Sequence, residues 1–288
     1  MTPMTIDASA VGATSTPADR SWTVDDVLLY ALAVGAGPDR LDLVTENATG
    51  IALRALPTLA ILLSTPIPQQ FDDPAQWSDL WTRVGAVEWP SVVHGAQGLT
   101  MHRPLPTSGT LTASTTVTAV WDKGRAAVLE LTTDAVLAGG EPLATATATL
   151  FVRGAGGWGG DRGPSASRPE EPSASPAAQI VHATRPEQAL LYRLCSDRNP
   201  LHCDPATARA AGFERPILHG LCTYAFAARA AIDVLCGGDP DALESLAGRF
   251  TAPVEPGDEL TTQVWPDGKY RTIRADGTLV LEGEARPR

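Results

Sequence analysis

The chain has 288 residues, of which 43% are hydrophobic and 19% charged, enough to form one large globular domain or two modest ones. The formal net charge is −11, and no Lys/Arg run occurs, which argues against nucleic acid as a partner. The most apolar runs, 27–34 and 56–63, are too short to cross a bilayer, so we expect a cytoplasmic protein without membrane contact.

The first half of the chain predicts a helix followed by strands. Residues 1–21 are rich in Thr, Ala, Ser, Pro and Asp and predict a disordered tail. Apolar residues at helical spacing predict a helix over 24–34, with Thr23 as its N-cap. Three β-strands, separated by turn sequences, are then predicted: 109–121, 125–137 and 142–152. We assign residues 22–153 to an N-terminal domain.

A segment rich in Gly, Pro and Ser separates the two halves. Residues 154–178 show no apolar periodicity and predict an exposed linker. The glycine run 154–160 superficially resembles a phosphate-binding loop. It lacks the GK[ST] ending and no helix follows, so we interpret it as structural.

The second half, residues 179–288, repeats the order of the first. A helix is predicted over 184–194, with Thr184 and Glu187 as a capping box. Asp204 is the expected N-cap of a short helix that ends at Gly212. A long helix that is apolar on nearly every face, and is therefore expected to be buried, runs to about residue 235. The remaining strands are predicted here: 244–252, 259–265 and 269–284, the last divided at 276–277.

A buried helix wrapped by an antiparallel sheet is the hotdog arrangement of the α+β class, here duplicated as a double hotdog. His219 is followed by about 24 residues before the next strand, enough for a full helix. His94 is followed by only about 14, interrupted by Pro104 and Pro106. We therefore expect a reduced central helix in the N-terminal repeat. The space that a full central helix would occupy in this repeat could take a long apolar substrate tail, or other side chains could fill it.

The stretch YRLCSDRNPLHCDPATARAAGFERPILHG, residues 192–220, is the most informative part of the chain. It places Asp197, Asn199 and His202 on one polar turn, and His219-Gly220 at the start of the buried helix. A carboxylate and an imidazole can grip one water molecule, and the N–H of a glycine at a helix N-terminus can stabilise an oxyanion. Simpler interpretations remain: an Asx turn, a tight helix entry and a core histidine.

The four cysteines are grouped in the same region, so a metal site must be considered. They lack CxxC spacing, and no HxxxH motif accompanies them. We predict half-buried free thiols and no metal. The cysteines are Cys195, Cys203, Cys222 and Cys236.

At residues 192–220 the sequence resembles the MaoC-like hydratases, specifically the enoyl-CoA hydratase 2 domain of peroxisomal multifunctional enzyme type 2. Other short segments of the chain resemble motifs of that domain and occur in the same order, over residues 22–286. These segments are 30–36, 57–58, 93–97, 103–106 and 156–160. The resemblance implies a double hotdog fold, a homodimer, and no metal or organic cofactor. It also implies reversible hydration of a trans-2-enoyl-CoA to a (3R)-3-hydroxyacyl-CoA, with an acyl-CoA as the small-molecule substrate.

Roles for individual residues follow from the resemblance. Asp197, Asn199 and His202 match the catalytic set, and we expect Gly220 to donate to the thioester oxygen. Further positions match the family and are expected to shape or support the substrate site: Glu46, Tyr30, His94, Tyr192, His219 and Gly98.

Two positions depart from the family pattern. Ser196 replaces a glycine that could need an unusual backbone angle, and Gly98 stands where an aromatic residue is frequent, which would enlarge the pocket. The phosphates of CoA require cations. The candidates are Arg103, Arg198, Arg215 and Arg249.

Three rival functions stay open at this point. One is a hydratase or dehydratase of the same fold that acts on a specialised acyl thioester, such as a sterol side chain, a branched chain or a polyketide intermediate. Another is a non-catalytic acyl-CoA-binding subunit, which would not require Asp197, Asn199 and His202 together. A thioesterase would have to aim its water at the carbonyl carbon rather than at C3.

Overall fold

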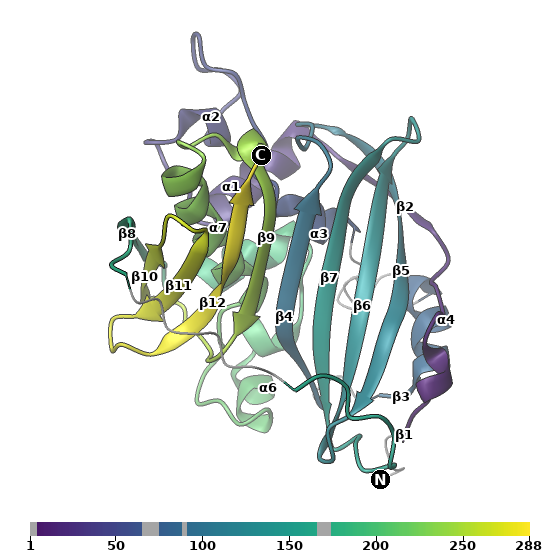
Figure 1. Ribbon diagram of the computed structural model, residues 1–288. Helices are drawn as coiled ribbons and strands as arrows, with labels where there is room; N and C mark the ends of the chain where they lie inside the picture. The colour runs from purple at the N-terminus through teal and green to yellow at the C-terminus, as the bar shows by residue number, and fades with distance from the viewer. Residues whose placement is uncertain (1–4, 65–74, 88–90, 166–173) are drawn as a thin grey trace.

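The computed structural model describes residues 5–64, 75–87, 91–165 and 174–288. Ten strands form one antiparallel sheet in the order β2-β5-β6-β7-β4-β9-β12-β11-β10-β8. Helices lie behind this sheet in Figure 1, and its other face is turned toward the viewer. The strands are β2 (Ala18–Trp22), β4 (Val92–Met101), β5 (Gly109–Asp122), β6 (Ala126–Leu137), β7 (Pro142–Arg153), β8 (Ala178–Ala183), β9 (Leu243–Phe250), β10 (Glu259–Val264), β11 (Lys269–Arg274) and β12 (Leu279–Pro287).

This strand order is symmetric about the pair β4–β9. Each strand of the N-terminal half has a partner at the mirrored place in the C-terminal half, so that β2 corresponds to β8 and β5 to β10. The halves are joined by backbone pairing, with Leu99 opposite Leu246. The duplicated hotdog expected from the sequence is therefore built as one continuous sheet rather than as two separate ones.

The helices follow the same duplication. The N-terminal repeat contains α1 (Val24–Ala33), α2 (Leu41–Val44), α3 (Leu59–Ser64) and α4 (Ala75–Val84). The C-terminal repeat contains α5 (Gln188–Tyr192), the 3-10 turns η3 (Arg193–Cys195) and η4 (Pro200–His202), α6 (Pro205–Ala210), α7 (Gly220–Leu235) and η5 (Pro240–Ala242). The buried helix α7 packs on β8–β12, and α3 packs on β2, β5, β6 and β7.

The central helix of the N-terminal repeat is α3, of which the structure describes six residues, up to the undescribed segment 65–74, whereas α7 has sixteen. The sequence argument looked for this helix after the wrong counterpart. His94 and Gly95 lie inside strand β4, where a bulge follows His94. The position that corresponds to His219-Gly220 is instead Pro57-Thr58, directly before α3.

Helix ends were predicted well where side-chain caps decide them. Thr23 caps α1 and forms a reciprocal capping box with Asp26. Asp204 accepts from the N–H groups of Ala206 and Thr207 at the start of α6. The capping box predicted at Thr184 is wrong, because the Thr184 hydroxyl donates to the carbonyl of Asp258 and α5 begins only at Gln188.

The expected disordered tail is also corrected where the structure describes it. Thr5–Ile6 forms β1 beside β3 (Gly85–Ala86), and η1 (Ala8–Ala10) follows. Residues 18–22 form β2, which pairs with β5 along its whole length. The polar tail is ordered by this backbone pairing, which a composition argument does not detect. Residues 1–4 lie outside the described part.

The glycine run expected to be an exposed linker is ordered around a buried carboxylate. Asp122 accepts hydrogen bonds from the N–H groups of Gly124, Gly157, Gly159 and Gly160. These bonds lower the pKa of Asp122. The glycines therefore have a structural role, as predicted, but in an anchored loop. Residues 166–173 lie outside the described part.

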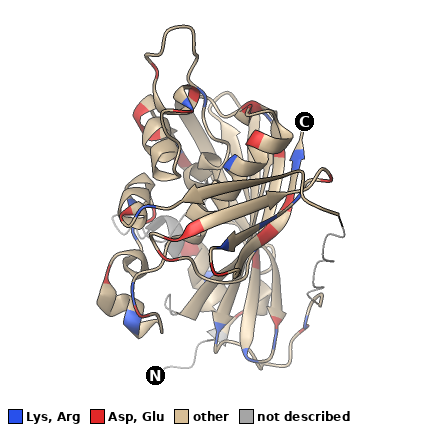
Figure 2. Ribbon diagram, turned by 90° about the vertical axis from the view of Figure 1, so that its left-hand side faces the viewer, with Lys and Arg blue, Asp and Glu red and all other residues tan. Residues whose placement is uncertain are grey.

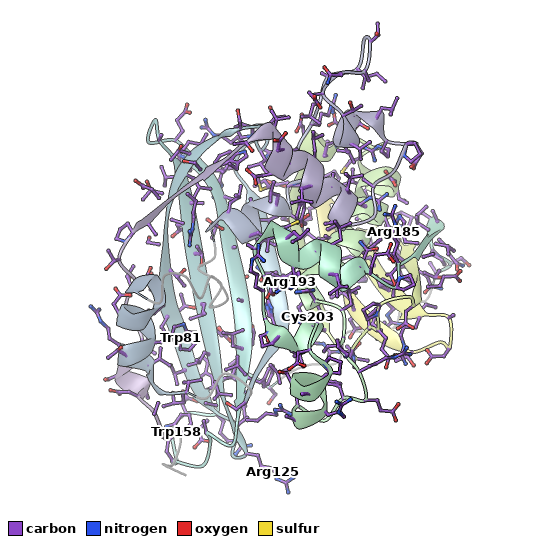
Figure 3. The ribbon with its side chains drawn as sticks, turned by 180° about the vertical axis from the view of Figure 1, so that it is seen from behind. Trp81, Arg125, Trp158, Arg185, Arg193 and Cys203 are labelled. Atoms are coloured by element: carbon purple, nitrogen blue, oxygen red, sulfur yellow. The ribbon has the colours of Figure 1, made fainter. Side chains whose placement is uncertain are left out.

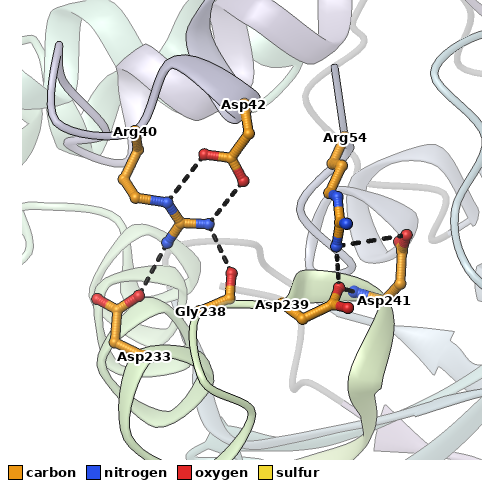
Figure 4. A network of polar contacts seen from close by, with 7 residues as sticks. All are labelled: Arg40, Asp42, Arg54, Asp233, Gly238, Asp239 and Asp241. Atoms are coloured by element: carbon orange, nitrogen blue, oxygen red, sulfur yellow. Dashed lines mark hydrogen bonds and ion pairs between the residues drawn. The ribbon is translucent and has the colours of Figure 1, made fainter. Parts of the chain in front are cut away.

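Two arginines fasten the N-terminal repeat to the end of α7 (Figure 4). Arg40 holds Asp42 through two hydrogen bonds, donates to Asp233 at 2.8 Å and reaches the carbonyl of Gly238 at 2.7 Å. We call this set of contacts the Arg40 clasp. Beside it, Arg54 pairs with Asp239 and Asp241.

Charged residues of both signs are interspersed over the face shown in Figure 2. In the described part of the chain, no helix is long and apolar enough to cross a membrane. The four cysteines are unpaired; three are half-buried, as predicted, whereas Cys222 is fully buried.

Candidate active site

The polar turn between η3 and α6 has the conformation of an Asx turn. The Asp197 carboxylate accepts from the N–H of Asn199 at 3.1 Å. Asn199 in turn accepts from the N–H of Leu201 at 3.0 Å and caps η4. The side-chain oxygen of Asn199 therefore has the structural role of an Asx turn, which was the simpler of the two interpretations of this residue. Ser196 has a φ of 163°, outside the left-handed region, so this position does not need the glycine of the family.

Three predicted residues come together at this turn: Asp197, His202 and His219 offer ligand atoms that lie within 4.8 Å of one another. The two imidazoles are stacked, with ring centroids 3.8 Å apart. His219 donates from Nε2 to the backbone carbonyl of Asp197 at 3.0 Å, and the same nitrogen lies 3.9 Å from Oδ1 of that residue. His219 thereby ties the N-terminus of α7 to the polar turn.

Hydrogen bonds to carbonyl groups fix the tautomers of both histidines. His202 Nδ1 lies 2.8 Å from the carbonyl of Ile217, and a carbonyl only accepts, so Nδ1 carries the hydrogen. The lone pair of His202 is therefore on Nε2. By the same argument the lone pair of His219 is on Nδ1, which is buried and has no hydrogen-bond partner in the described chain.

Burial sets the protonation of the site. Desolvation lowers the pKa of His202 to about 4 and that of His219 well below its ordinary value, so both are neutral bases at pH 7. Desolvation raises the pKa of Asp197 to about 6, against the opposing hydrogen bond from Asn199 and the charge of Arg193. A carboxylate whose pKa lies near the working pH is suited to accept and return a proton.

Gly220 opens α7, so its N–H has no acceptor within the helix and lies in the positive field of the N-terminus. It does not have a positive φ. The heavy atoms nearest to a Cβ at this position would be those of the Phe250 ring, at ordinary contact distances of 3.4 to 3.7 Å. Neither the backbone angle nor these contacts require glycine here.

Two buried tyrosines lie behind the histidines. The ring of Tyr192 is 4.8 Å from that of His219 and 6.2 Å from that of Tyr30. The Tyr192 hydroxyl is buried without a hydrogen-bond partner among the described residues. Among the described contacts, neither tyrosine forms a hydrogen bond to the polar turn, and their expected role in shaping the substrate site stays a prediction.

His94 reaches the site indirectly, from the other repeat. Its Nε2 bonds to the carbonyl of Ala96 at 3.0 Å, and its ring packs edge-on against Phe250 at 5.2 Å. Phe250 in turn borders Gly220. Sequence analysis missed Phe250, because it reads as an ordinary strand residue.

Glu46 and Gly98 are not brought to this cluster. Glu46 is exposed in the loop after α2 and accepts a hydrogen bond from its neighbour Asn47. Gly98 faces away from the helices, since Leu99 next to it packs in the core. A Cβ on Gly98 would lie 2.4 Å from the Thr147 hydroxyl. Gly98 lines a groove of about 440 Å³ on the outer face of the sheet and does not enlarge the candidate site.

Most of the arginines proposed for the phosphates of CoA already have carboxylate partners. Arg215 pairs with Glu255, Arg249 with Glu282, and Arg103 with Glu141. Arg198 is exposed and forms no ion pair in the described part of the chain.

A residue that sequence analysis missed is Arg193, on η3. Its Nε is buried and has no hydrogen-bond partner among the described residues. Figure 3 shows Arg193 on the helix-covered side of the sheet, on η3, which precedes the polar turn in the chain. The signal was available, because Arg193 lies inside the recognised motif, but a single arginine on a predicted helix reads as a solvated residue.

Comparison with known proteins covers almost the whole chain. Residues 21–154 match the model of the MFE-2 hydratase 2 N-terminal domain, and residues 167–281 match that of the MaoC like domain. The chain is 42% identical to the 3-hydroxyacyl-thioester dehydratase Y of Mycobacterium tuberculosis, over 94% of this chain and 91% of that protein. It is 40% identical to the enoyl-CoA hydratase ChsH3 of the same organism, over 98% of both chains.

Solved structures agree in fold. The crystal structure of a MaoC-like dehydratase from Phytophthora capsici superposes with a TM-score of 0.83 at 28% identity, covering 98% of each chain.

Proposed function

This chain belongs to the MaoC-like hydratase 2 family, and from that membership and the geometry of the site we infer that it is an enoyl-CoA hydratase. The reaction is the reversible addition of water to a trans-2-enoyl-CoA, and we propose the (3R)-3-hydroxyacyl-CoA as its product. The observation that carries this proposal is the convergence of Asp197 and His202, with complementary protonation states, beside the N-terminus of α7.

In the proposed mechanism a water molecule donates one hydrogen bond to the Asp197 carboxylate and another to Nε2 of His202. Its oxygen attacks C3 of the conjugated thioester while Asp197 takes its proton. The π pair of the C2–C3 bond then forms a C1–C2 double bond, and the π pair of the carbonyl moves to the thioester oxygen, which the N–H of Gly220 stabilises. Asp197 then returns the proton to C2, so that one water is added and the enzyme is regenerated.

This scheme uses neither a metal nor an organic cofactor. A metal bound by both histidines would have to lie in both ring planes, whereas the rings of His202 and His219 are stacked face to face. Their arrangement therefore favours acid–base chemistry over metal ligation. The homodimer and the cytoplasmic location expected from the sequence stay predictions.

The nature of the acyl chain is the open part of the function. We propose that a long or bulky tail lies beside α3, of which six residues are described, because α7 with sixteen residues fills the corresponding space in the other repeat. A sterol side chain, a branched chain or a polyketide intermediate therefore remains the alternative to an ordinary fatty acyl chain. A non-catalytic subunit is disfavoured, because binding alone gives no reason to enclose an unpaired carboxylate.

A hydration assay tests the proposal. Straight, branched and sterol trans-2-enoyl-CoAs are offered, and loss of the absorbance of the conjugated thioester is followed for the wild type and for Asp197→Asn and His202→Gln. Chiral analysis of the product tests the (3R) configuration separately. Full activity in both variants would refute the proton-transfer roles.

A further inference from the structure

His219 contacts both of the groups that are proposed to hold the attacking water. From Nε2 it donates to the backbone carbonyl of Asp197 at 3.0 Å, and its ring is stacked on that of His202 with the centroids 3.8 Å apart. The residue after it is Gly220, the proposed oxyanion donor. One side chain therefore lies where the separate parts of the candidate site meet.

The side chain of His219 has no part in starting α7. The residue is the N-cap of this helix, and its backbone carbonyl accepts from the N–H groups of Cys222 at 3.1 Å and Thr223 at 3.2 Å, but no side-chain hydrogen bond caps the helix. The side chain is 1% exposed, and its Nδ1 has no hydrogen-bond partner among the described residues. A buried acceptor without a partner lowers stability, so an apolar ring would suit the packing better.

The two contacts of His219 differ in how easily they are replaced. His202 has a second anchor, because its Nδ1 donates to the carbonyl of Ile217 at 2.8 Å. In the described part of the chain, the backbone carbonyl of Asp197 accepts from His219 alone. Loss of the His219 donor therefore releases the main chain that carries the proposed base, whereas loss of the His219 ring leaves His202 held on its other side.

The N-terminal repeat shows that the fold itself does not require this histidine. The residue that corresponds to His219 there is Pro57, which lies two residues before α3. A proline side chain offers neither a donor nor an aromatic ring. The repeat without the proposed catalytic groups thus also lacks the histidine, although it keeps the strands and the place of its central helix.

We propose that His219 is a positioning residue, which holds the main chain of Asp197 and the ring of His202 at the spacing that one water molecule can bridge. It acts through these two residues and exchanges no proton with the substrate. Misplacing a reacting group by about 1 Å can cost about 100-fold in rate, so one hydrogen bond behind the base has a large effect. This inference rests on the proposed function, because it assumes that Asp197 and His202 hold the attacking water.

Three substitutions separate the two contacts. His219→Gln keeps an N–H near the place of Nε2 but removes the ring. His219→Asn ends one bond earlier and does not reach the carbonyl, and His219→Phe keeps a flat ring without a donor. Steady-state hydration of one trans-2-enoyl-CoA gives kcat and KM, thermal scans give stability, and titration with a saturated acyl-CoA measures binding without reaction.

We expect His219→Asn and His219→Phe to lose about 10- to 100-fold in kcat. Their KM, and their Kd for the saturated acyl-CoA, should stay within about threefold of the wild type, because the residue does not touch substrate. His219→Gln should restore kcat to within a few-fold of the wild type. If His219→Phe does not fold, the two amides His219→Asn and His219→Gln, which differ only in reach, give the same test.

His182→Phe is the matched control. The ring of His182 lies 5.5 Å from that of Phe226 on α7, and among the described contacts it meets none of the proposed catalytic groups. The same change of histidine to phenylalanine should therefore leave kcat at the wild-type value.

Three outcomes would overturn the inference. Wild-type kcat in His219→Asn and His219→Phe would show that the contacts are dispensable. A rise in KM and Kd at unchanged kcat would mean that His219 touches the substrate. Equal losses in all three variants, His219→Gln included, would assign the imidazole a different role. A wild type that hydrates no enoyl-CoA would refute the proposed function, and this inference with it.

Discussion

The two repeats of this chain use the same turn for different purposes. Tyr30 and Tyr192 stand at corresponding places, and positions 162 residues apart can be compared without a gap from there to the start of the central helices. Several identities support this register: Pro38 and Pro200, Asp42 and Asp204, Leu56 and Leu218. The catalytic positions differ. Asp197 corresponds to Gly35, Asn199 to Gly37, His202 to Arg40 and Gly220 to Thr58.

Where the C-terminal turn holds Asp197 and His202, the corresponding N-terminal turn connects its repeat to α7. Arg40, at the position of His202, forms the Arg40 clasp with the end of α7. Gly35, at the position of Asp197, has a φ of +80° and lies against Phe226 and Arg229 of α7. Corresponding positions of the two repeats can therefore carry either the proposed proton-transfer groups or contacts that hold the repeats together. The second case applies to the N-terminal turn, against which the long helix α7 packs.

The strongest test of this comparison is loss of the proton-transfer groups. Asp197→Asn and His202→Gln should each lower kcat by roughly 10²- to 10⁴-fold, the usual contribution of a positioned acid or base. Melting temperatures should stay near that of the wild type, because Asn keeps an acceptor for the Asn199 N–H and Gln keeps a donor for the Ile217 carbonyl. Initial rates and thermal scans on the same samples measure both, and a large fall in melting temperature would contradict the assignment.

The next prediction compares two substitutions of glycine by alanine, Gly220→Ala in the C-terminal repeat and Gly35→Ala in the N-terminal repeat. Gly220→Ala should fold normally, because its methyl group would contact only Phe250, yet should lose about 100-fold in kcat/KM by crowding the thioester oxygen. Gly35→Ala should show the opposite pattern. Its φ is +80° and its methyl group would lie 2.4 Å from the Phe226 ring, so we expect a loss of about 2–3 kcal/mol in unfolding free energy.

Urea denaturation and steady-state kinetics separate the two effects. Equal loss of stability in both glycine variants would mean that Gly220 serves the helix entry alone.

Breaking the Arg40 clasp should affect stability without altering the chemistry. Arg40→Gln leaves Asp42 and Asp233 without their common partner, and we expect a loss of about 2–4 kcal/mol in unfolding free energy. Under conditions where the variant is folded, kcat should lie within a few-fold of the wild type. A variant of wild-type stability would show that the contact is a surface pair with little net value.

How much of the fold and of the candidate site could be predicted from the sequence depends on how far apart the interacting residues lie along the chain. Caps such as Thr23 and Asp204 were predictable, because the partner is two or three residues away. The convergence of Asp197, His202 and His219 was predictable through the family motif. The order of residues 5–22 was not, since Thr5–Ile6 pair with β3 and residues 18–22 pair with β5, about eighty to ninety residues later. The exclusion of Glu46 and Gly98 depends likewise on tertiary placement that spacing does not encode.

The smallest predicted effect concerns pH. The pKa of Asp197 is raised to about 6, so its basic form is lost as the pH falls through 6, and kcat/KM should fall about tenfold per unit below that. His202, with a pKa of about 4, stays neutral over this range and should add a second limb only near pH 4. A profile measured from pH 4 to 9 checks both; a flat response between 5 and 7 would contradict Asp197 as the base.

The backbone seam between β4 and β9 has a consequence for how such a molecule can evolve. If two identical halves met at this seam as separate chains, any shortening of the central helix would appear in both at once and open the interior on both sides. Covalent fusion removes that constraint. One repeat can then lose part of its central helix and its acid–base residues, while the other repeat still covers the interior and keeps the proposed catalytic groups.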